Sequence, residues 1–133
     1  MPDYFTRAEA EALLPRLTTL LRETQSLRNE LADRETEYVA LQRRLRSNGH
    51  SAHPEQEALP AQIVELTQRL MDRARAISAL GVLIKDIEMG LVDFPALRNG
   101  REVYLCWRLH EEHVAWWHEV ESGFTSRQPL EDE

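Results

Sequence analysis

A heptad pattern in the first third of the chain limits the folds that this sequence can adopt. Mostly apolar side chains recur every seven residues over five heptads. They occupy two positions of the repeat: Ala10, Leu17, Thr24, Leu31, Tyr38 and Leu45 at one, and Leu13, Leu20, Leu27, Arg34 and Leu41 at the other. This spacing aligns them on one face of a long helix and is typical of helices that pack as a coiled coil. We therefore predict a helix over residues 6–48.

Capping signals mark the ends of this predicted helix. Thr6 is followed three residues later by Glu9, which is the spacing of a capping box, and Asn48-Gly49 is a stop signal. Pro15 lies inside the helix and lacks a backbone donor, so we expect a kink there or a short initial helix.

A second apolar stripe predicts a shorter helix over residues 55–80, with Gly81 at its C-terminal cap. The stripe consists of Leu59, Ile63, Leu66, Leu70, Ile77 and Leu80. The segment between the two stripes, residues 47–54, is polar and rich in turn formers, and it includes His50 and His53. We expect an exposed loop there, so that the two helices form a long antiparallel hairpin.

Beyond Gly81 the apolar period changes from about 3.6 residues to about 2, which predicts strands. Three alternating segments within residues 82–107 are separated by Gly90 and by the turn at residues 98–100, and they predict a small three-stranded antiparallel meander. Pro95 indicates that the second strand is interrupted or partly unpaired.

The third predicted strand has two different faces. Val103, Leu105 and Trp107 should point to one side, and Tyr104 and Cys106 to the other. One face would cover the helices, which leaves the other face for a site.

The rest of the chain predicts a short C-terminal helix over residues 111–121, closed by Gly123, and a frayed tail over residues 128–133. The expected fold is therefore α+β, with a helical hairpin, a three-stranded sheet and a short third helix. A chain of 133 residues is long enough for one core of its own, so we expect a single domain over residues 1–133.

The net charge of −7 is concentrated in the second part of the chain. Residues 1–80 hold 12 acidic and 11 basic side chains, whereas residues 81–133 hold 11 acidic and 5 basic ones. Nucleic-acid binding needs a basic surface that displaces counterions, so we do not expect DNA or RNA as a partner.

The sequence also predicts where the protein works. No window approaches the run of about 18 apolar residues that a membrane span needs, and no basic segment followed by an apolar run begins the chain. The single cysteine, Cys106, is ordinary for a reducing compartment. We expect a soluble cytoplasmic protein.

Side chains that ligate metals are concentrated after residue 81. Cys106, Glu111 and His118 would converge if the third strand delivers the thiol to a helix that carries the other two residues on one face. Asp86 and Asp93 on neighbouring strands would complete the set. Thiolate, imidazole and carboxylate are accepted ligands of zinc and other divalent metals, so the sequence predicts a candidate metal site here. The spacing matches no standard signature, and the alternative is that these residues only pack and form hydrogen bonds.

Other motifs give weaker signals. His110 and His113 are three residues apart, not four, so they do not form the zinc motif of metalloproteases. A nucleophilic Cys106 with His118 as its base is a further alternative, without a supporting local signature. Three arginines in the acidic part, Arg101, Arg108 and Arg127, are candidates for binding a carboxylate or phosphate ligand, or for pairing with nearby acids.

The second part of the chain resembles the bacterial family known as domain of unknown function 2203, and the resemblance extends over nearly the whole chain. The matching residues are Lys85, Asp86, Gly90, Asp93, Phe94, Pro95, Gly100, Arg101, Val103, Tyr104, Leu105, Cys106, Trp107, Glu111, Trp117, His118, Gly123, Phe124 and Arg127. His110 departs from the pattern, because it stands where the resemblance implies glycine. The resemblance implies no activity.

Two classes of function remain. The broad apolar stripe of the first helix is more than a small sheet can cover, which predicts a non-enzymatic interaction protein that forms a homodimer. The alternative is a metal-binding protein or metal-dependent enzyme built around Cys106, Glu111 and His118.

Overall fold

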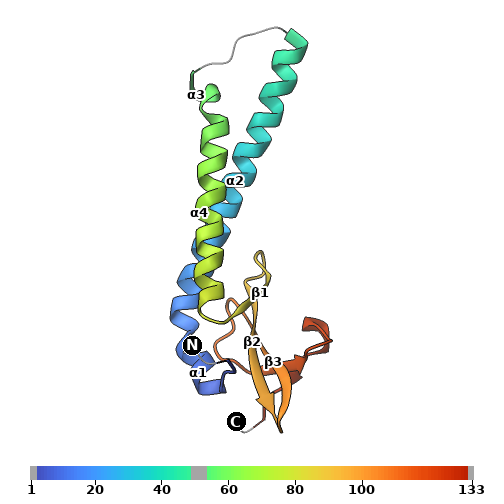
Figure 1. Cartoon of the computed structure of the whole chain (residues 1–133). Coiled ribbons are helices and arrows are strands. Elements are labelled where there is room, and N and C mark those ends of the chain that lie inside the picture. The colour runs from blue at the N-terminus through green and yellow to red at the C-terminus, as the bar shows by residue number, and fades with distance from the viewer. Residues whose placement is uncertain (1–2, 49–53, 132–133) are drawn as a thin grey trace.

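The computed structural model describes residues 3–48 and 54–131, which form a pair of long helices with an antiparallel sheet at one end (Figure 1). The fold is α+β, as predicted. Its elements are α1 (Arg7–Ala12), α2 (Leu14–Asn48), α3 (Pro54–Glu57), α4 (Leu59–Ala79), β1 (Leu83–Asp86), β2 (Leu91–Arg98), β3 (Arg101–Arg108), β4 (Trp116–Glu119), the 3-10 helix η1 (Phe124–Ser126) and β5 (Gln128–Pro129).

The predicted capping box at the start of the chain is confirmed. The Thr6 side chain accepts a hydrogen bond from the Glu9 backbone at 3.1 Å, and the Glu9 carboxylate accepts one from the Thr6 backbone at 2.9 Å. The helix then breaks at Leu13, so the predicted helix over residues 6–48 is two helices, α1 and α2. Pro15 lies in the first turn of α2, where a missing backbone donor costs little, and the expected short initial helix is confirmed.

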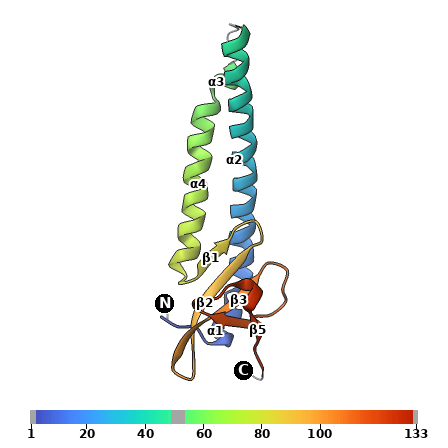
Figure 2. The ribbon, with the colours of Figure 1, turned by 90° about the vertical axis from the view of Figure 1, so that its right-hand side faces the viewer.

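Helices α2 and α4 lie side by side and run in opposite directions (Figures 1 and 2). The predicted hairpin of two uninterrupted helices is not what the described chain shows. The region predicted as one helix over residues 55–80 is divided into α3 and α4, because Pro60 starts a new helix after Ala58. The predicted loop falls mainly on residues 49–53, which lie outside the described residues, as do His50 and His53.

The sheet has five antiparallel strands in the order β1-β2-β3-β4-β5, so the prediction of three strands was too low. The first three are the predicted meander. Pro95 does not interrupt β2: it pairs with Tyr104. On the other side of β2, the pairing with β1 extends only to Asp93, so Pro95 needs no donor for that strand. The carbonyl of Pro95 accepts a hydrogen bond from the backbone of Phe5 at 2.7 Å.

The predicted helix over residues 111–121 is wrong, because Trp116–Glu119 forms β4. The neighbours Trp117 and His118 are both buried, with 8% and 3% of their surface exposed. A strand points successive side chains to opposite faces and can bury both, whereas a surface helix buries only one stripe. As part of a strand, Trp117 and His118 can therefore both be buried, one on each face of the sheet.

The predicted frayed tail is also wrong over the residues that are described. Gln128–Pro129 pairs with β4 as β5, and Leu130 is 8% exposed. The Leu130 backbone donates a hydrogen bond to the carbonyl of Ala115 at 2.8 Å. The buried Leu130 side chain and this backbone hydrogen bond, together with the pairing to β4, hold the segment in place.

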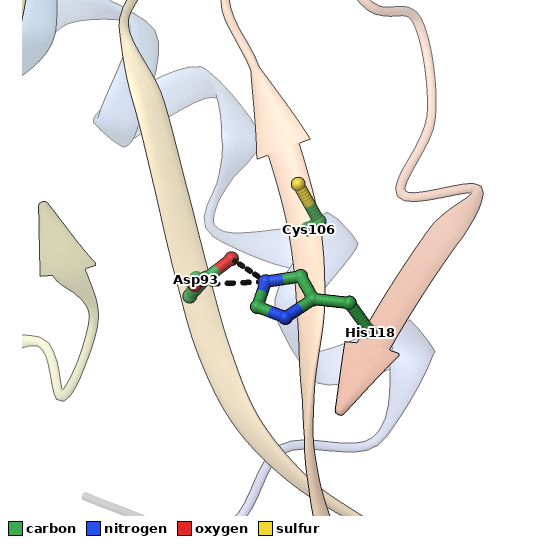
Figure 3. Close-up of side chains that lie close together, drawn as sticks. All are labelled: Asp93, Cys106 and His118. Atoms are coloured by element: carbon green, nitrogen blue, oxygen red, sulfur yellow. Dashed lines mark hydrogen bonds and ion pairs between the residues drawn. The ribbon is translucent and has the colours of Figure 1, made fainter. Parts of the chain in front are cut away.

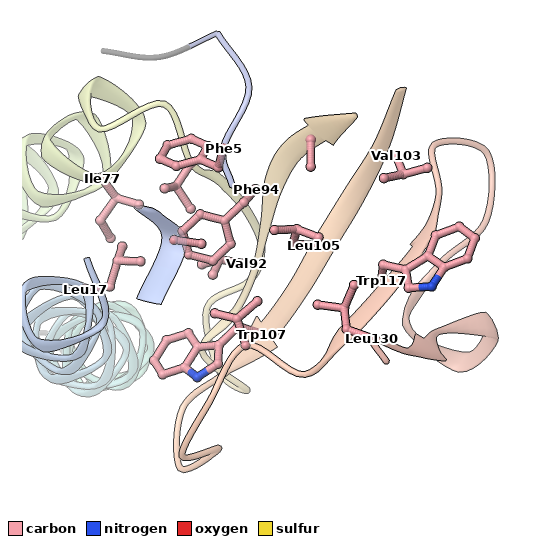
Figure 4. Close-up of a cluster of buried hydrophobic side chains, with 14 of the residues drawn as sticks. Phe5, Leu17, Ile77, Val92, Phe94, Val103, Leu105, Trp107, Trp117 and Leu130 are labelled. Atoms are coloured by element: carbon pink, nitrogen blue, oxygen red, sulfur yellow. The ribbon is translucent and has the colours of Figure 1, made fainter. Parts of the chain in front are cut away.

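The hydrophobic core lies between one face of the sheet and the ends of α2 and α4 that are next to the sheet (Figure 4). Leu17 of α2 and Ile77 of α4 are fully buried there. The sheet contributes Val92, Phe94, Val103, Leu105 and Trp107. The predicted two-faced β3 is thereby confirmed, since Tyr104 and Cys106 alternate with these core residues and face the other side.

Glycine positions define the turns as predicted. Asn99 and Gly100 both have positive φ, 53° and 78°, which is the conformation of a two-residue hairpin turn between β2 and β3. Gly90 has φ 65° in the turn before β2, and Gly81 has φ 89° after α4. In the part of the chain that the structure describes, no helix is long and apolar enough to cross a membrane.

Gly90 and Gly100 provide a matched pair for a stability test. A Cβ at Gly100 would meet nothing within 4 Å, whereas a Cβ at Gly90 would lie 2.5 Å from the Cγ of buried Leu109. Gly100→Ala should therefore cost about 1 kcal/mol for its positive φ alone. Gly90→Ala should cost roughly 1–3 kcal/mol more, because Leu109 must move. Urea denaturation of both variants measures the difference, and equal losses would contradict this account of the turn.

Candidate functional site

Three buried polar side chains meet on the outer face of the sheet, opposite the hydrophobic core (Figure 3). Asp93 of β2 is paired with Cys106 of β3, so their side chains share a face. His118 of β4 is paired with Tyr104, two residues from Cys106, and therefore lies on this face as well. Exposed fractions are 1% for Asp93, 1% for Cys106 and 3% for His118.

The His118 ring is held at both nitrogens. Its Nδ1 lies 2.7 Å from the carbonyl oxygen of Glu119, and its Nε2 lies 3.0 Å from each oxygen of the Asp93 carboxyl group. A carbonyl oxygen can only accept, so Nδ1 carries a proton. The other ring nitrogen, Nε2, faces the carboxyl group of Asp93.

The thiol of Cys106 completes a compact set of ligand atoms. One oxygen of Asp93, one ring nitrogen of His118 and the Cys106 sulfur all lie within 4.8 Å of one another. They come from three different strands, so the sheet itself fixes their spacing. Among the described residues, this is the group whose side chains can hold a metal ion together.

Burial controls the protonation of the two acidic members. It raises the pKa of Asp93, against the lowering effects of His118 and Lys85. Lys85 of β1 places its ammonium group 3.9 Å from Asp93 Oδ2. Burial, together with the negative charge of Asp93, raises the pKa of Cys106 to about 11 despite the opposing effect of Arg127. In the absence of a bound cation, the thiol is neutral at pH 7.

A cavity of about 160 Å³ borders this group. Ser122, Gly123 and Phe124, which follow β4, contribute to its lining. The complete lining is Lys85, Leu91, Asp93, Cys106, His118, Ser122, Gly123 and Phe124. The cavity therefore gives a small ligand access to all three polar side chains.

Glu111 does not join this set. Its carboxylate binds the Arg127 guanidinium through two contacts of 2.7 and 3.2 Å and accepts a hydrogen bond from the Arg108 backbone at 2.9 Å. The prediction that Glu111 and His118 share a helical face fails because the helix does not form. Asp86 also lies outside the group of Asp93, Cys106 and His118. Its Oδ1 accepts a hydrogen bond from the Met89 backbone at 3.1 Å in the turn after β1.

The three candidate arginines have separate partners. Arg101 forms an ion pair of 2.6 Å with Glu119 at the surface. The guanidinium of Arg108 lies 5.8 Å from the centre of the Phe124 ring. Arg127, besides binding Glu111, lies between the rings of Trp116 and Phe124 at 4.5 and 4.3 Å.

The two weaker histidine candidates lie outside the cavity. His113 Nδ1 is 3.1 Å from the carboxylate of Glu11, which also accepts a hydrogen bond from the Val114 backbone at 3.0 Å. His110 has φ 83°, a conformation that favours glycine, and this explains why the resemblance implies glycine there.

Lys85 is the functional candidate that the sequence prediction missed. Alternation from Leu83, which pairs with Asp93, suggests this face, but the β1–β2 register shifts between Ile84 and Asp86, at Lys85 itself. The ion pair with Asp93 is what places the Lys85 ammonium group at the site.

The Cys106 thiol should make the free energy of unfolding depend on pH in the alkaline range. The pKa of Cys106 rises from 9.0 to about 11 on folding, so the folded chain keeps a proton that the unfolded chain loses. The stability that this retained proton contributes is complete below pH 9 and is lost as the pH rises to about 11, with a size of about 3 kcal/mol. Urea denaturation of metal-free protein and of Cys106→Ala at pH 8 and pH 10.5 tests this. An equal fall in both proteins would assign the pH effect to other groups.

Comparison with known proteins identifies the family and nothing closer. The family model described as "Uncharacterized conserved protein (DUF2203)" matches residues 3–130. No curated protein and no solved structure matches the chain. Since the matched region includes the two long helices α2 and α4, all five strands and the Asp93, Cys106 and His118 group, the chain belongs to the DUF2203 family of uncharacterized conserved proteins.

Proposed function

We propose that this protein binds a divalent transition metal ion, with zinc as the first candidate, through Asp93, Cys106 and His118. The observation that supports the proposal is the meeting of three different ligand types, buried and within 4.8 Å of one another, beside a cavity. It corresponds to the alternative function inferred from the sequence, with Asp93 in the place of Glu111.

The orientation of His118 supports the proposal. Histidines that ligate metals usually donate their other ring proton to a carbonyl or carboxylate, which fixes the tautomer and the ring. His118 Nδ1 has such a partner in the carbonyl of Glu119, at 2.7 Å. Its Nε2 consequently faces Asp93, where a metal ion would bind between the two side chains.

The charges of the ligands also suit a divalent cation. Ionised Asp93 and Cys106 together carry two negative charges, which a divalent ion neutralises inside a buried site. In a tetrahedral zinc site neighbouring ligand atoms lie about 3.5 Å apart, so the sulfur must move toward the other two ligands. That movement requires a change in the side-chain torsion of Cys106.

Asp86, Glu111, Arg101, Arg108 and Arg127 have no ligand role in this proposal. The contacts described above commit Asp86 to a turn and Glu111 to Arg127. Arg127 acts indirectly, because its cation lowers the pKa of Cys106 and so favours the thiolate that a metal needs.

The homodimer remains a prediction of the heptad pattern. Its argument is weaker than the sequence suggested, because Leu17, Leu21 and Leu27 of α2 are 0%, 0% and 6% exposed within a single chain. The apolar stripe is thus largely covered by α4 and the sheet, and the metal site becomes the better supported function.

Metal binding should depend on the three proposed ligands. Protein treated with chelator and then titrated with cobalt(II) should show the absorption bands of thiolate-bound cobalt, and competition with zinc gives the zinc affinity. Asp93→Asn, Cys106→Ser and His118→Ala should each weaken binding by about 100-fold or more. The controls Asp86→Asn and His113→Ala change the same residue types outside the site and should bind normally. Equal weak binding by the unmodified protein and the ligand variants would refute the proposal.

Zinc binding should also release protons. At pH 7 the Cys106 thiol holds a proton that a bound metal would displace, so at least one proton should leave per zinc ion. Calorimetric titration in buffers with different ionisation enthalpies counts the released protons. The Cys106→Ser variant should release about one proton fewer than the unmodified protein. Zinc binding without proton release would show that the ion binds elsewhere.

A further inference from the structure

We infer that the proposed metal centre keeps one coordination position open, and that a small monoanion occupies it with Lys85 as its counter-charge. This inference rests on the proposed function. It adds the ligand that the site would accept.

The described chain supplies three ligands and no nearby fourth. Glu111 is held by Arg127, and Asp86 is held by the backbone of Met89. Zinc bound by three protein side chains completes its coordination with water or another exchangeable ligand. The structure leaves space for such a ligand, because the cavity touches Asp93, Cys106 and His118 alike.

The size of the cavity restricts the ligand. Pockets for drug-sized molecules typically measure about 300–1,000 Å³. This cavity measures about 160 Å³, and a bound metal ion would take part of it. The open position therefore suits a ligand of a few non-hydrogen atoms.

The charge balance indicates an anion. Without a metal, the ammonium group of Lys85 is paired with Asp93 at 3.9 Å. When the metal takes the charge of Asp93, Lys85 loses that partner, whereas Arg127 keeps Glu111 at 2.7 Å. One positive charge is then left beside the cavity, which matches a monoanion better than a dianion.

Lys85 is also suited to this role by its chemistry. It is the only lysine of the chain, in which the other 15 basic residues are arginines. Its side chain is 42% exposed and its ammonium lies 4.9 Å from the centre of the Tyr104 ring, so the charge stands at the edge of the site. An ammonium is a compact point charge on a flexible stem, which can turn from Asp93 to a ligand in the cavity.

The test uses the full chain loaded with cobalt(II), with sodium azide as the probe and acetate and inorganic phosphate as comparisons. Azide and acetate should change the cobalt absorption in a saturable way, and phosphate should bind more weakly than acetate. Lys85→Met should weaken azide binding about tenfold, the value of one charge-assisted hydrogen bond. Cobalt itself should bind this variant as tightly or more tightly, because a positive charge near the ion is removed.

Two control variants separate charge from structure. Lys85→Arg keeps the charge and should retain most of the azide affinity. Arg28→Met removes a cation that pairs with Glu88 at 3.9 Å instead of facing the cavity, and it should change nothing. Circular dichroism checks that every variant is folded.

Each other outcome has a defined meaning. Cobalt binding without any anion effect, azide binding that ignores Lys85→Met, or phosphate binding tighter than acetate would overturn this inference and leave the proposed function intact. Failure of the unmodified protein to bind cobalt would overturn both.

The single lysine allows an independent measurement. Reductive methylation with ¹³C-formaldehyde labels Lys85 and the α-amino group while keeping the positive charge. In the zinc-loaded protein, the Lys85 methyl resonance should shift when azide is added. The same resonance should not respond to azide in metal-free protein, and an unchanged resonance in both states would contradict a role of Lys85.

Discussion

The register of the β2–β3 hairpin determines both the core and the candidate site. The turn at Asn99 and Gly100 has positive φ at both residues, and it pairs Asp93 with Cys106 and Phe94 with Leu105. A slip of one residue would turn every side chain of a strand to the other face. Phe94 would then point away from the helices, and Asp93 would enter an apolar core without a partner, at a cost of several kcal/mol. The apolar face of the sheet therefore also fixes the position of the polar group behind it.

Burial of a polar group needs partners, and the segment after β3 provides them. His118 of β4 reaches Asp93 across β3, and residues after β4 line the same cavity as both side chains. Arg127 supports this segment, because its guanidinium packs on the rings of Trp116 and Phe124 and binds Glu111. Glu111, which the sequence suggested as a ligand, thus contributes to the wall of the site by fixing Arg127. The acid and the base neutralise each other in a partly buried position, where either alone would be costly.

Local signals in the sequence predicted most of the fold, and long-range pairing accounts for the errors. The cap at Thr6, the turns at Gly90 and Gly100 and the two faces of β3 depend on neighbouring residues, and each was predicted correctly. Strand β4 depends on β3 for its hydrogen bonds, and β5 depends on β4, so neither is visible in a local pattern. The pairing of Asp93 with Cys106 could have been found, since both lie equally far from the Asn99-Gly100 turn. The structural role of Glu111 could not have been predicted in this way, because it depends on an ion pair with Arg127, which lies 16 residues away.

The electrostatics of the site favour a ligand role for Cys106 over a nucleophilic one. A reactive cysteine needs a lowered pKa and a base with a free nitrogen. Burial instead raises the pKa of Cys106 to about 11, and both nitrogens of His118 already face oxygen atoms, those of Glu119 and Asp93. Only about one thiol in ten thousand would be ionised at pH 7. A divalent cation reverses this balance, because it brings the positive charge that stabilises thiolate and carboxylate together in a buried place. The same burial that makes Cys106 a poor nucleophile therefore makes its ionisation depend on a bound cation.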